Sequence, residues 1–274
     1  MTTTVQEQAP AHTGVARNHA ESHENKMHSD EVAAKLGFEG ALVPGVTVFG
    51  LTSIALTKQF GGDWLQGTTL HTRFLKPAYH DDKLDVFLTS NEEQSEARCL
   101  NKDGTLLCTL QMQSGTETPE FGNHNFDLSA LPIASDRKNR KEISWEHIRE
   151  GIPFPVRPWH VGAEENVKFA NEVQDDHSAF TTEGTALVHP HLILSQANQV
   201  LVDEFEMPAW IHVGSEVRLH QALKQSTDYR LFAVPVRKWK NKGHEFITVY
   251  IAYEHKGEAH AEIFHTAIYR IAGI

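Results

Sequence analysis

Two short stretches near the N-terminus hold residue types that could move a proton at a carbonyl group. Asn25 and His28 stand three residues apart, and Pro44 and Gly45 open an apolar segment shortly afterwards. Histidine carries protons near neutral pH because its ordinary pKa is about 6.5. A helix that begins at Gly45 would present unpaired backbone N–H groups, which stabilise negative charge on an oxygen atom. The spacing therefore predicts acid–base chemistry at a carbonyl, with His28 as the proton carrier.

Each of these residues also has a purely structural interpretation. His28 could cap the short helix predicted after Ser29, where the backbone would hold its ring. Asn25 could be a turn residue whose side chain bonds its own backbone. Gly45 could serve only to let the chain pack closely at the start of the helix. The sequence leaves these alternatives open, and only the order and spacing of the three residues favour a reactive site.

The elements around these residues follow a helix-then-strands pattern. The segment 46–61, "VTVFGLTSIALTKQFG", is too densely apolar for a surface helix, so we expect it to be enclosed. Strand-like runs with period-two alternation come next, with turn signals at Asp103-Gly104 and Lys242-Gly243. A buried helix followed by an antiparallel meander predicts the α+β class.

The pattern occurs twice. A shift of 145 residues without a gap places Asp30 on Asp175 and the stretch 41–43, "ALV", on the identical stretch 186–188. Segment 115–149 is interpreted as a linker, because most of it is rich in turn residues and charged residues. We therefore expect a disordered tail over 1–12, a first repeat over 13–114 and a degenerate second repeat over 150–274.

Composition excludes several classes of function. A formal net charge of -11 argues against a general nucleic-acid binder or an anionic-membrane binder, because both need a basic surface. Cys99 and Cys108 lie in a strand-like hairpin without a CxxC motif or a secretory segment, which indicates reduced thiols and a cytoplasmic location. The chain holds 18 histidines but no HExxH motif and no matching set of ligands, so we expect no metal.

The residues 25–45, "NKMHSDEVAAKLGFEGALVPG", together with 73–84, "RFLKPAYHDDKL", resemble the MaoC-like (R)-specific enoyl-CoA hydratase family. The family pattern Asp-x-Asn-Pro-x-His-x-Asp meets this chain at residues 23–30, "HENKMHSD". Asn25, His28 and Asp30 match the pattern. His23 stands where the family has its catalytic Asp, and Lys26 replaces the proline. The resemblance covers nearly the whole chain as two fused hotdogs, a double hotdog, and only the first repeat carries the motif well.

This resemblance implies a hydro-lyase, either a hydratase or a dehydratase, that acts on an acyl thioester. Gly45 and Val46 would supply the N–H groups that bind the thioester oxygen. CoA or phosphopantetheine would enter only as part of the substrate, with no separate cofactor. The expected partner is thus a small-molecule acyl thioester, with no nucleic acid and no membrane, and the sequence leaves a homodimer open. The alternatives are an acyl-thioester hydrolase and a non-catalytic acyl-binding subunit.

The replaced Asp raises the question of where a carboxylate would come from. Glu24 is one source, and Asp176 beside His177 in the second repeat is another. His23 could be part of the machinery or a solvated loop residue, and Asp176 and His177 could simply start a helix. His189 could project toward the shared cleft or lie satisfied in the core.

The second repeat has lost the motif itself. At the fixed offset His28 falls on Val173, Asn25 on Ala170 and Gly45 on Pro190. The second repeat therefore lacks both the proton carrier and the glycine. We expect one working site per chain.

Overall fold

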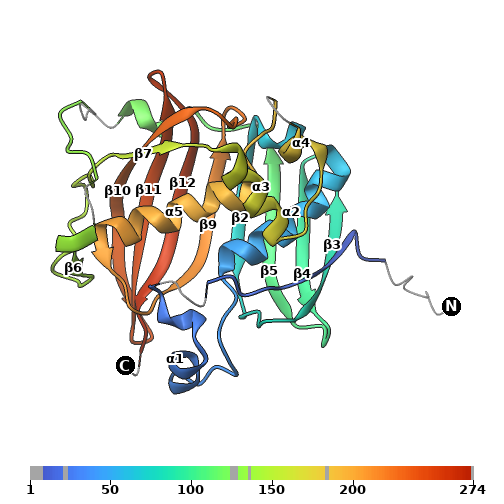
Figure 1. Ribbon diagram of the computed structural model, residues 1–274, viewed down its shortest axis with the longest axis horizontal. Helices are drawn as coiled ribbons and strands as arrows, with labels where there is room; N and C mark the ends of the chain where they lie inside the picture. Colours follow the sequence, from blue (N-terminus) through green and yellow to red (C-terminus); the bar gives the residue numbers. More distant parts are fainter. Residues whose placement is uncertain (1–8, 21–23, 124–128, 135–136, 183–184, 273–274) are drawn as a thin grey trace.

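The computed structural model describes residues 9–20, 24–123, 129–134, 137–182 and 185–272 of the 274-residue chain. Its centre is a ten-stranded antiparallel sheet, and one face of this sheet carries two long helices, α2 (Gly45–Phe60) and α5 (Pro190–Glu204) (Figure 1). A buried helix on an antiparallel sheet, present twice, confirms the predicted α+β double-hotdog architecture.

The first repeat contributes five strands to the sheet. Turn residues and alternating burial along the strands produce a meander after α2. The elements in order are β1 (His12–Val15), the 3-10 helix η1 (Lys26–His28), α1 (Asp30–Lys35), α2, η2 (Asp63–Leu65), β2 (Thr68–Phe74), β3 (Lys83–Ser90), β4 (Gln94–Asn101) and β5 (Leu106–Ser114).

The second repeat has nearly the same order of elements, with the short strand β8 between its long helix and its meander where the first repeat has η2. The segment between the repeats holds η3 (Glu120–Asn123), η4 (Arg137–Asn139) and β6 (Lys141–Glu142). The second repeat then consists of β7 (Arg157–His160), α3 (Ala163–Glu172), α4 (Ser178–Thr181), α5, β8 (Phe205–Glu206), β9 (Ile211–Leu219), β10 (Asp228–Asn241), β11 (His244–His255) and β12 (Glu258–Arg270).

The two repeats form one continuous sheet because β2 pairs with β9. The strand order is β1-β3-β4-β5-β2-β9-β12-β11-β10-β7, with Leu70 opposite Val217 at the seam. The backbones approach closely there, since a Cβ on Gly214 would lie 2.7 Å from the Thr72 carbonyl oxygen. A residue with a side chain at position 214 would force the two strands apart.

The 145-residue repeat is reproduced in the strand register. Thr13 of β1 pairs with Asp85 of β3, and the shifted residues Pro158 and Arg230 pair in the same way. The short bridge between Leu42 and Tyr79 likewise recurs between residues 187 and 224. The offset read from the sequence is therefore a structural repeat of the backbone.

The two long helices pack against each other and against the sheet. Every residue from Val46 to Thr57 of α2 is buried, which confirms the expected enclosure. The helices approach closely at Gly50, where an added Cβ would lie 2.8 Å from the Cβ of His191. Within the described residues, no helix is both long and apolar enough to span a lipid bilayer.

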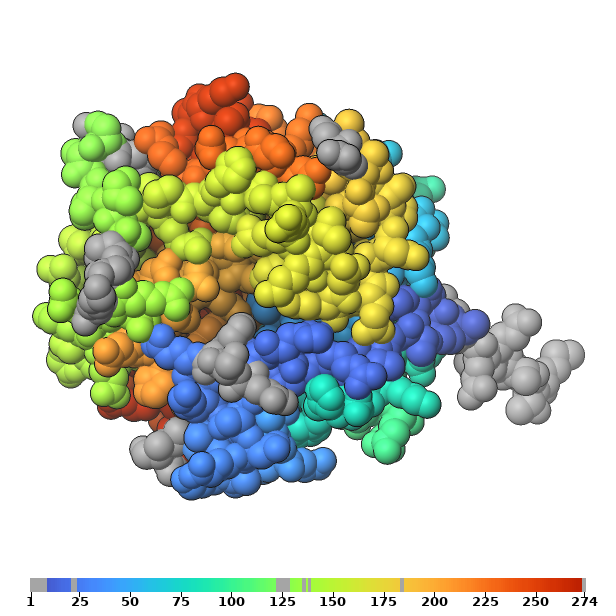
Figure 2. All heavy atoms as spheres, in the orientation of Figure 1, coloured from blue at the N-terminus to red at the C-terminus, as the bar shows by residue number. Residues whose placement is uncertain are grey.

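The segments before and between the repeats cover the helices and extend the sheet. Residues 1–8 of the predicted tail lie outside the described residues, while His12 begins strand β1. In the space-filling view the blue N-terminal segment runs beside the yellow segment that contains α3, over the middle of the helical face (Figure 2). Part of the predicted linker is packed as well, because Ile143 and Ile148 are buried.

The two cysteines face each other in neighbouring strands. Cys99 of β4 is the register partner of Cys108 of β5, and both thiols are free and buried. Burial raises the pKa of Cys99 to about 12 and that of Cys108 to about 11. Both side chains are therefore neutral core residues.

Candidate active site

The first residue of the motif in the described part of this region is Asn25, which precedes helix η1 and binds both this helix and Trp210. Its Oδ1 accepts hydrogen bonds from the Met27 and Trp210 N–H groups, each at 3.2 Å. Its Nδ2 donates to the Trp210 carbonyl at 3.0 Å. Asn25 thus has the expected turn role and also ties the first repeat to the second.

His28 is the last residue of η1, and its ring is oriented by the backbone. Nδ1 lies 2.7 Å from the Leu42 carbonyl oxygen, which can only accept, so Nδ1 carries the proton in the neutral ring. Nε2 then has the lone pair, and it lies 3.3 Å from Asn25 Nδ2. The tautomer is the one in which Nε2 can serve as a base.

The entrance of helix α2 offers backbone donors. The preceding residue Pro44 occupies the cap position, and no side chain there accepts from the helix. Among the described residues, no backbone group accepts from the N–H groups of Gly45 and Val46, as expected for the first turn of a helix. A Cβ on Gly45 would lie 3.4 Å from the Phe74 ring, so the glycine keeps this entrance open.

Two cavities meet at these residues. We call them the apolar cavity, of about 250 Å³, and the polar cleft, of about 490 Å³. Aliphatic and aromatic side chains such as Val48, Phe74 and Ile268 line most of the apolar cavity. Five residues, here called the junction, line both cavities: Asn25, His28, Pro44, Asn198 and Trp210. The structure therefore brings His28, Asn25 and the α2 entrance together at the boundary between the two cavities.

Glu24 lines the polar cleft but is engaged elsewhere. Its two carboxylate oxygens receive Arg140 Nη1 at 3.0 Å and Nη2 at 2.9 Å, and the Met207 N–H donates to Oε1 at 3.4 Å. This bidentate ion pair anchors the N-terminal segment to the segment between the repeats, and the Met207 contact links it to the second repeat. His23, the residue at the position of the family's catalytic Asp, lies outside the described residues.

The histidine at the entrance of α5 lies in the core. His189 has an exposed fraction of 0%, and its Nδ1 accepts from the His191 N–H at 3.1 Å. Its Nε2 therefore carries the proton and donates to Asp175 Oδ2 at 3.2 Å. Burial lowers the pKa of His189, which keeps the ring neutral. His189 lines neither the apolar cavity nor the polar cleft, because its side chain caps helix α5.

The other residues that the sequence suggested from the second repeat also have local structural roles. His177 precedes α4, and its Nδ1 accepts from the Ala179 N–H at 3.2 Å. Asp176 is exposed beside it. Neither residue lines the apolar cavity or the polar cleft, so the structure does not bring them to His28.

Sequence reasoning missed two residues of the junction, Asn198 and Trp210. Asn198 is a polar residue within the mostly buried helix α5, and this placement is a signal that a sequence reading could have used. Trp210 directly precedes β9 and is buried. Both reach His28 only through the contact between the repeats, across more than 160 residues of chain.

A buried histidine pair lies behind the apolar cavity. His212 lines this cavity, and its Nε2 is 2.9 Å from Ser215 Oγ, which is 3.2 Å from His265 Nδ1. Burial lowers the pKa of His212 well below its usual value and that of His265 to about 3. Both rings are therefore neutral at pH 7.

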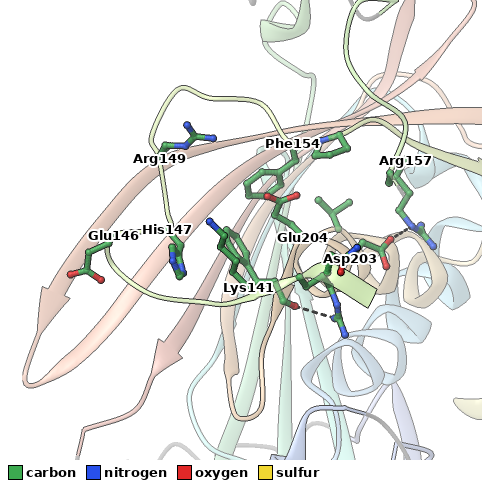
Figure 3. Close-up of a pocket in the computed structure, with 14 residues that line it drawn as sticks. Lys141, Glu146, His147, Arg149, Phe154, Arg157, Asp203 and Glu204 are labelled. Carbon is green, nitrogen blue, oxygen red and sulfur yellow. Dashed lines mark hydrogen bonds and ion pairs between the residues drawn. The ribbon is translucent and has the colours of Figure 1, made fainter. Parts of the chain in front are cut away.

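A third cavity, of about 510 Å³, lies beside the segment that joins the repeats. Charged side chains line it, and one of them, Arg157, pairs with Asp203 at 2.6 Å (Figure 3). It shares Arg157 with the polar cleft, whereas His28 does not line it. Nowhere in the described part of the chain do three His, Cys, Asp or Glu side chains gather so that they could hold a metal ion.

The comparisons with known proteins agree on the fold. No protein-family profile matches the sequence, and no curated protein matches it significantly. A structure from Chloroflexus aurantiacus, described as a MaoC domain protein dehydratase, superposes with a TM-score of 0.60 at 11% identity, over 97% of this chain and 96% of that one. A conserved hypothetical protein from Mycobacterium tuberculosis with a double hotdog fold gives 0.57 at 14% identity, over 95% and 96%.

A third similar structure is described as having a different activity. It is described as an oleoyl thioesterase from Lactobacillus plantarum, and it superposes with a TM-score of 0.51 at 12% identity, over 94% of this chain and 96% of that one. Identities this low define the fold alone. The chain therefore has the double hotdog fold, and its chemistry has to be argued from its own residues.

Proposed function

We propose that this protein is a hydro-lyase that adds water to, or removes it from, an acyl thioester, like the MaoC-like hydratases that its motif resembles. The observation that carries the proposal is the position of His28. Its Nδ1 is bound to the Leu42 carbonyl at 2.7 Å. Its side chain lines both cavities, beside the entrance of α2. Gly45 lines the apolar cavity and Val46 the polar cleft, so a base lies beside two backbone donors.

The reaction would run as follows in the hydration direction. His28 Nε2 takes a proton from water while the water oxygen forms a bond to C3 of the enoyl group. The electrons of the C2–C3 double bond move toward the thioester oxygen, and the N–H groups of Gly45 and Val46 stabilise the resulting enolate. The imidazolium then returns its proton to C2. The product is a 3-hydroxyacyl thioester, and dehydration is the same sequence in reverse.

The two cavities suit the two parts of such a substrate. The apolar cavity would receive the acyl chain, because burial of apolar surface is favourable there. The polar cleft would receive the pantetheine arm, whose amides need hydrogen-bond partners. CoA or phosphopantetheine would be part of the substrate, and the reaction needs no further cofactor. Such chemistry also fits the cytoplasmic location that the sequence predicts.

The charge pattern favours this reaction over thioester hydrolysis. A hydrolase of this fold would use a carboxylate to activate water at the carbonyl carbon, and Glu24 is the acidic residue of the polar cleft closest in sequence to the motif. Both of its oxygens accept hydrogen bonds from Arg140, so the carboxylate is already engaged in an ion pair. His28 has its Nδ1 bound to the Leu42 carbonyl at 2.7 Å, so Nε2 is the basic nitrogen of the neutral ring.

An assay with crotonyl-CoA tests the proposal. Hydration removes the ultraviolet absorbance of the conjugated enoyl thioester, and free thiol is not released. We expect loss of this absorbance with formation of 3-hydroxybutyryl-CoA. Release of thiol would instead show a thioesterase, and tight binding with neither change would show an acyl-binding protein.

A further inference from the structure

One arginine side chain joins the segment before the motif to the end of helix α5. Arg140 lies between the repeats, and its Nη1 and Nη2 donate to the two carboxylate oxygens of Glu24 at 3.0 Å and 2.9 Å. Nη1 also donates to the carbonyl oxygens of Val202 and, at 3.1 Å, of Phe205. Val202 belongs to the last turn of α5, where carbonyl groups lack partners within the helix. Arg140 therefore caps the end of α5 and holds Glu24 beside it.

Arg140 is itself held in place by its surroundings. It directly precedes β6, which pairs in parallel with β8 so that Lys141 lies opposite Phe205. Its Nε donates to the carbonyl oxygen of Arg137 at 3.1 Å. Its side chain is only 12% exposed, so water has little access to its donors. A planar guanidinium group in this position binds several acceptors in a fixed geometry, which the single ammonium group of a lysine does not reproduce.

The chain that follows Glu24 runs beside the chain that follows β8. The Met207 N–H donates to Glu24 Oε1 at 3.4 Å, and the Lys26 N–H donates to the Pro208 carbonyl oxygen at 2.8 Å. Arg140 contacts Glu24 in the first of these two segments and Phe205 in the second. The guanidinium group therefore fixes the two segments relative to each other at one end.

Asn25 fixes the same two segments at the other end. It binds both the N–H and the C=O of Trp210, at 3.2 Å and 3.0 Å. Its Nδ2 also lies 3.3 Å from His28 Nε2. The position of His28 thus depends on a short segment that Arg140 holds on one side and Asn25 on the other.

We infer that Arg140 is a positioning residue for the hydration of the thioester: it holds the segment 24–28 so that His28 stays beside the entrance of α2. This inference rests on the proposed function. Arg140 lines the third cavity but neither the apolar cavity nor the polar cleft, so it acts through Glu24 and not on the substrate. The segment between the repeats is then part of the machinery of the site, although it carries no group that reacts.

Steady-state kinetics of crotonyl-CoA hydration test this role. Arg140→Met keeps a long side chain and removes every donor. We expect kcat to fall by about 5- to 50-fold, because a small displacement of a catalytic group is costly, while KM changes by less than about threefold. Arg140→Lys keeps the charge without the planar fork and should give an intermediate kcat.

A double variant tests whether Arg140 acts through Glu24. Glu24→Gln alone should lower kcat by a smaller factor than Arg140→Met, because the amide keeps one acceptor oxygen. The variant with both substitutions should match Arg140→Met within about twofold, since the two residues share one contact.

A second arginine–glutamate pair gives a matched control for general damage. Arg230 Nε lies 2.6 Å from Glu254 Oε2, and this pair joins β10 to β11. Neither residue lines any of the three cavities. Arg230→Met should therefore keep the wild-type kcat per folded molecule, with the folded fraction measured by circular dichroism.

Three outcomes would overturn the positioning role while the proposed function stands. They are an unchanged kcat in folded Arg140→Met, an equal fall of kcat in Arg230→Met, and a raised KM with unchanged kcat, which would mean that Arg140 binds the substrate. If the wild-type protein does not hydrate crotonyl-CoA, the proposed function itself fails, and the positioning role fails with it.

Discussion

The two long helices begin in different surroundings although the chain around them repeats. Helix α5 is closed at its start, because Pro190 has no N–H group and the ring of His189 accepts from the next free one at 3.1 Å. Helix α2 follows Pro44 without any side-chain cap, and its first residue is a glycine. The same backbone frame therefore gives one helix entrance closed by a side-chain cap and one without such a cap.

The residues beside the two helix entrances also differ, with polar side chains at α2 and apolar side chains at α5. The positions equivalent to Asn25 and His28 are Ala170 and Val173, and both have an exposed fraction of 0%. Apolar packing replaces the hydrogen-bonding groups, so the second entrance is part of the core. Function in a duplicated fold can thus depend on where polar groups are left unpaired, since the two backbones are alike.

The largest expected effect is on catalysis at the α2 entrance. His28→Ala should lower the turnover of crotonyl-CoA hydration by about 10²–10⁴-fold, as for a lost general acid–base group. The free energy of unfolding should fall by only about 1 kcal/mol, because one hydrogen bond to the Leu42 carbonyl is removed. The exposed histidine of β7 gives a matched control, since His160→Ala should keep wild-type turnover. Equal turnover in the His28 and His160 variants would refute the role of His28.

At the α5 entrance we expect the opposite result, a large effect on stability and none on turnover. His189→Ala removes the cap of α5 and leaves the buried carboxylate of Asp175 without its partner at 3.2 Å. We expect a loss of about 2–4 kcal/mol in unfolding free energy, measured by urea denaturation, with turnover per folded molecule unchanged. A stable variant with reduced turnover would mean that His189 acts on the substrate after all.

The buried histidines should make the second repeat sensitive to acid. Burial lowers the pKa of His191 to about 3 and that of His265 to about 3, whereas both titrate near 6.5 in the unfolded chain. The unfolded state therefore binds more protons as the pH falls below about 6.5, and stability is lost in that range. For these two residues we expect the unfolding free energy at pH 5.5 to be about 2–3 kcal/mol below that at pH 7. Urea denaturation at constant ionic strength measures this, and a flat profile would contradict the burial of neutral rings.

A smaller effect is expected when the open entrance is filled. A side chain at position 45 would contact the Phe74 ring from 3.4 Å outward, so Gly45→Val should weaken the binding of butyryl-CoA by about 5- to 100-fold. Gly162→Val is a suitable control, because a Cβ there would meet only Glu165, at 3.9 Å. Unchanged binding by the folded Gly45 variant would place the thioester away from the α2 entrance.

Much of the fold could be predicted because it depends on local patterns. The dense apolar run after Gly45, the alternating strands and the 145-residue offset are all visible in one dimension, and they lead directly to a helix wrapped by a sheet, present twice. The grouping of Asn25, His28 and the α2 entrance followed from a motif contained within twenty-one residues, 25–45.

The rest of the site depends on contacts between distant residues. Nothing in the local sequence shows that Arg140 binds Glu24, or that Asn198 and Trp210 line the same space as His28. The sequence also left two interpretations of His189, and only the packing of α3, α4 and α5 around it shows that its ring is buried. Side-chain burial at a repeat interface is a property of the folded chain and has no periodic signature.

A crystal structure of the protein with butyryl-CoA, which cannot be hydrated, is the most direct test of the proposed site. We predict that the thioester oxygen lies about 2.7–3.1 Å from the N–H groups of Gly45 and Val46, with the acyl chain in the apolar cavity and C3 facing His28. The entrance of α5 should hold no ligand. A thioester bound at α5, in the cavity beside Arg149, or with its carbonyl group turned away from Gly45 would contradict the proposed site.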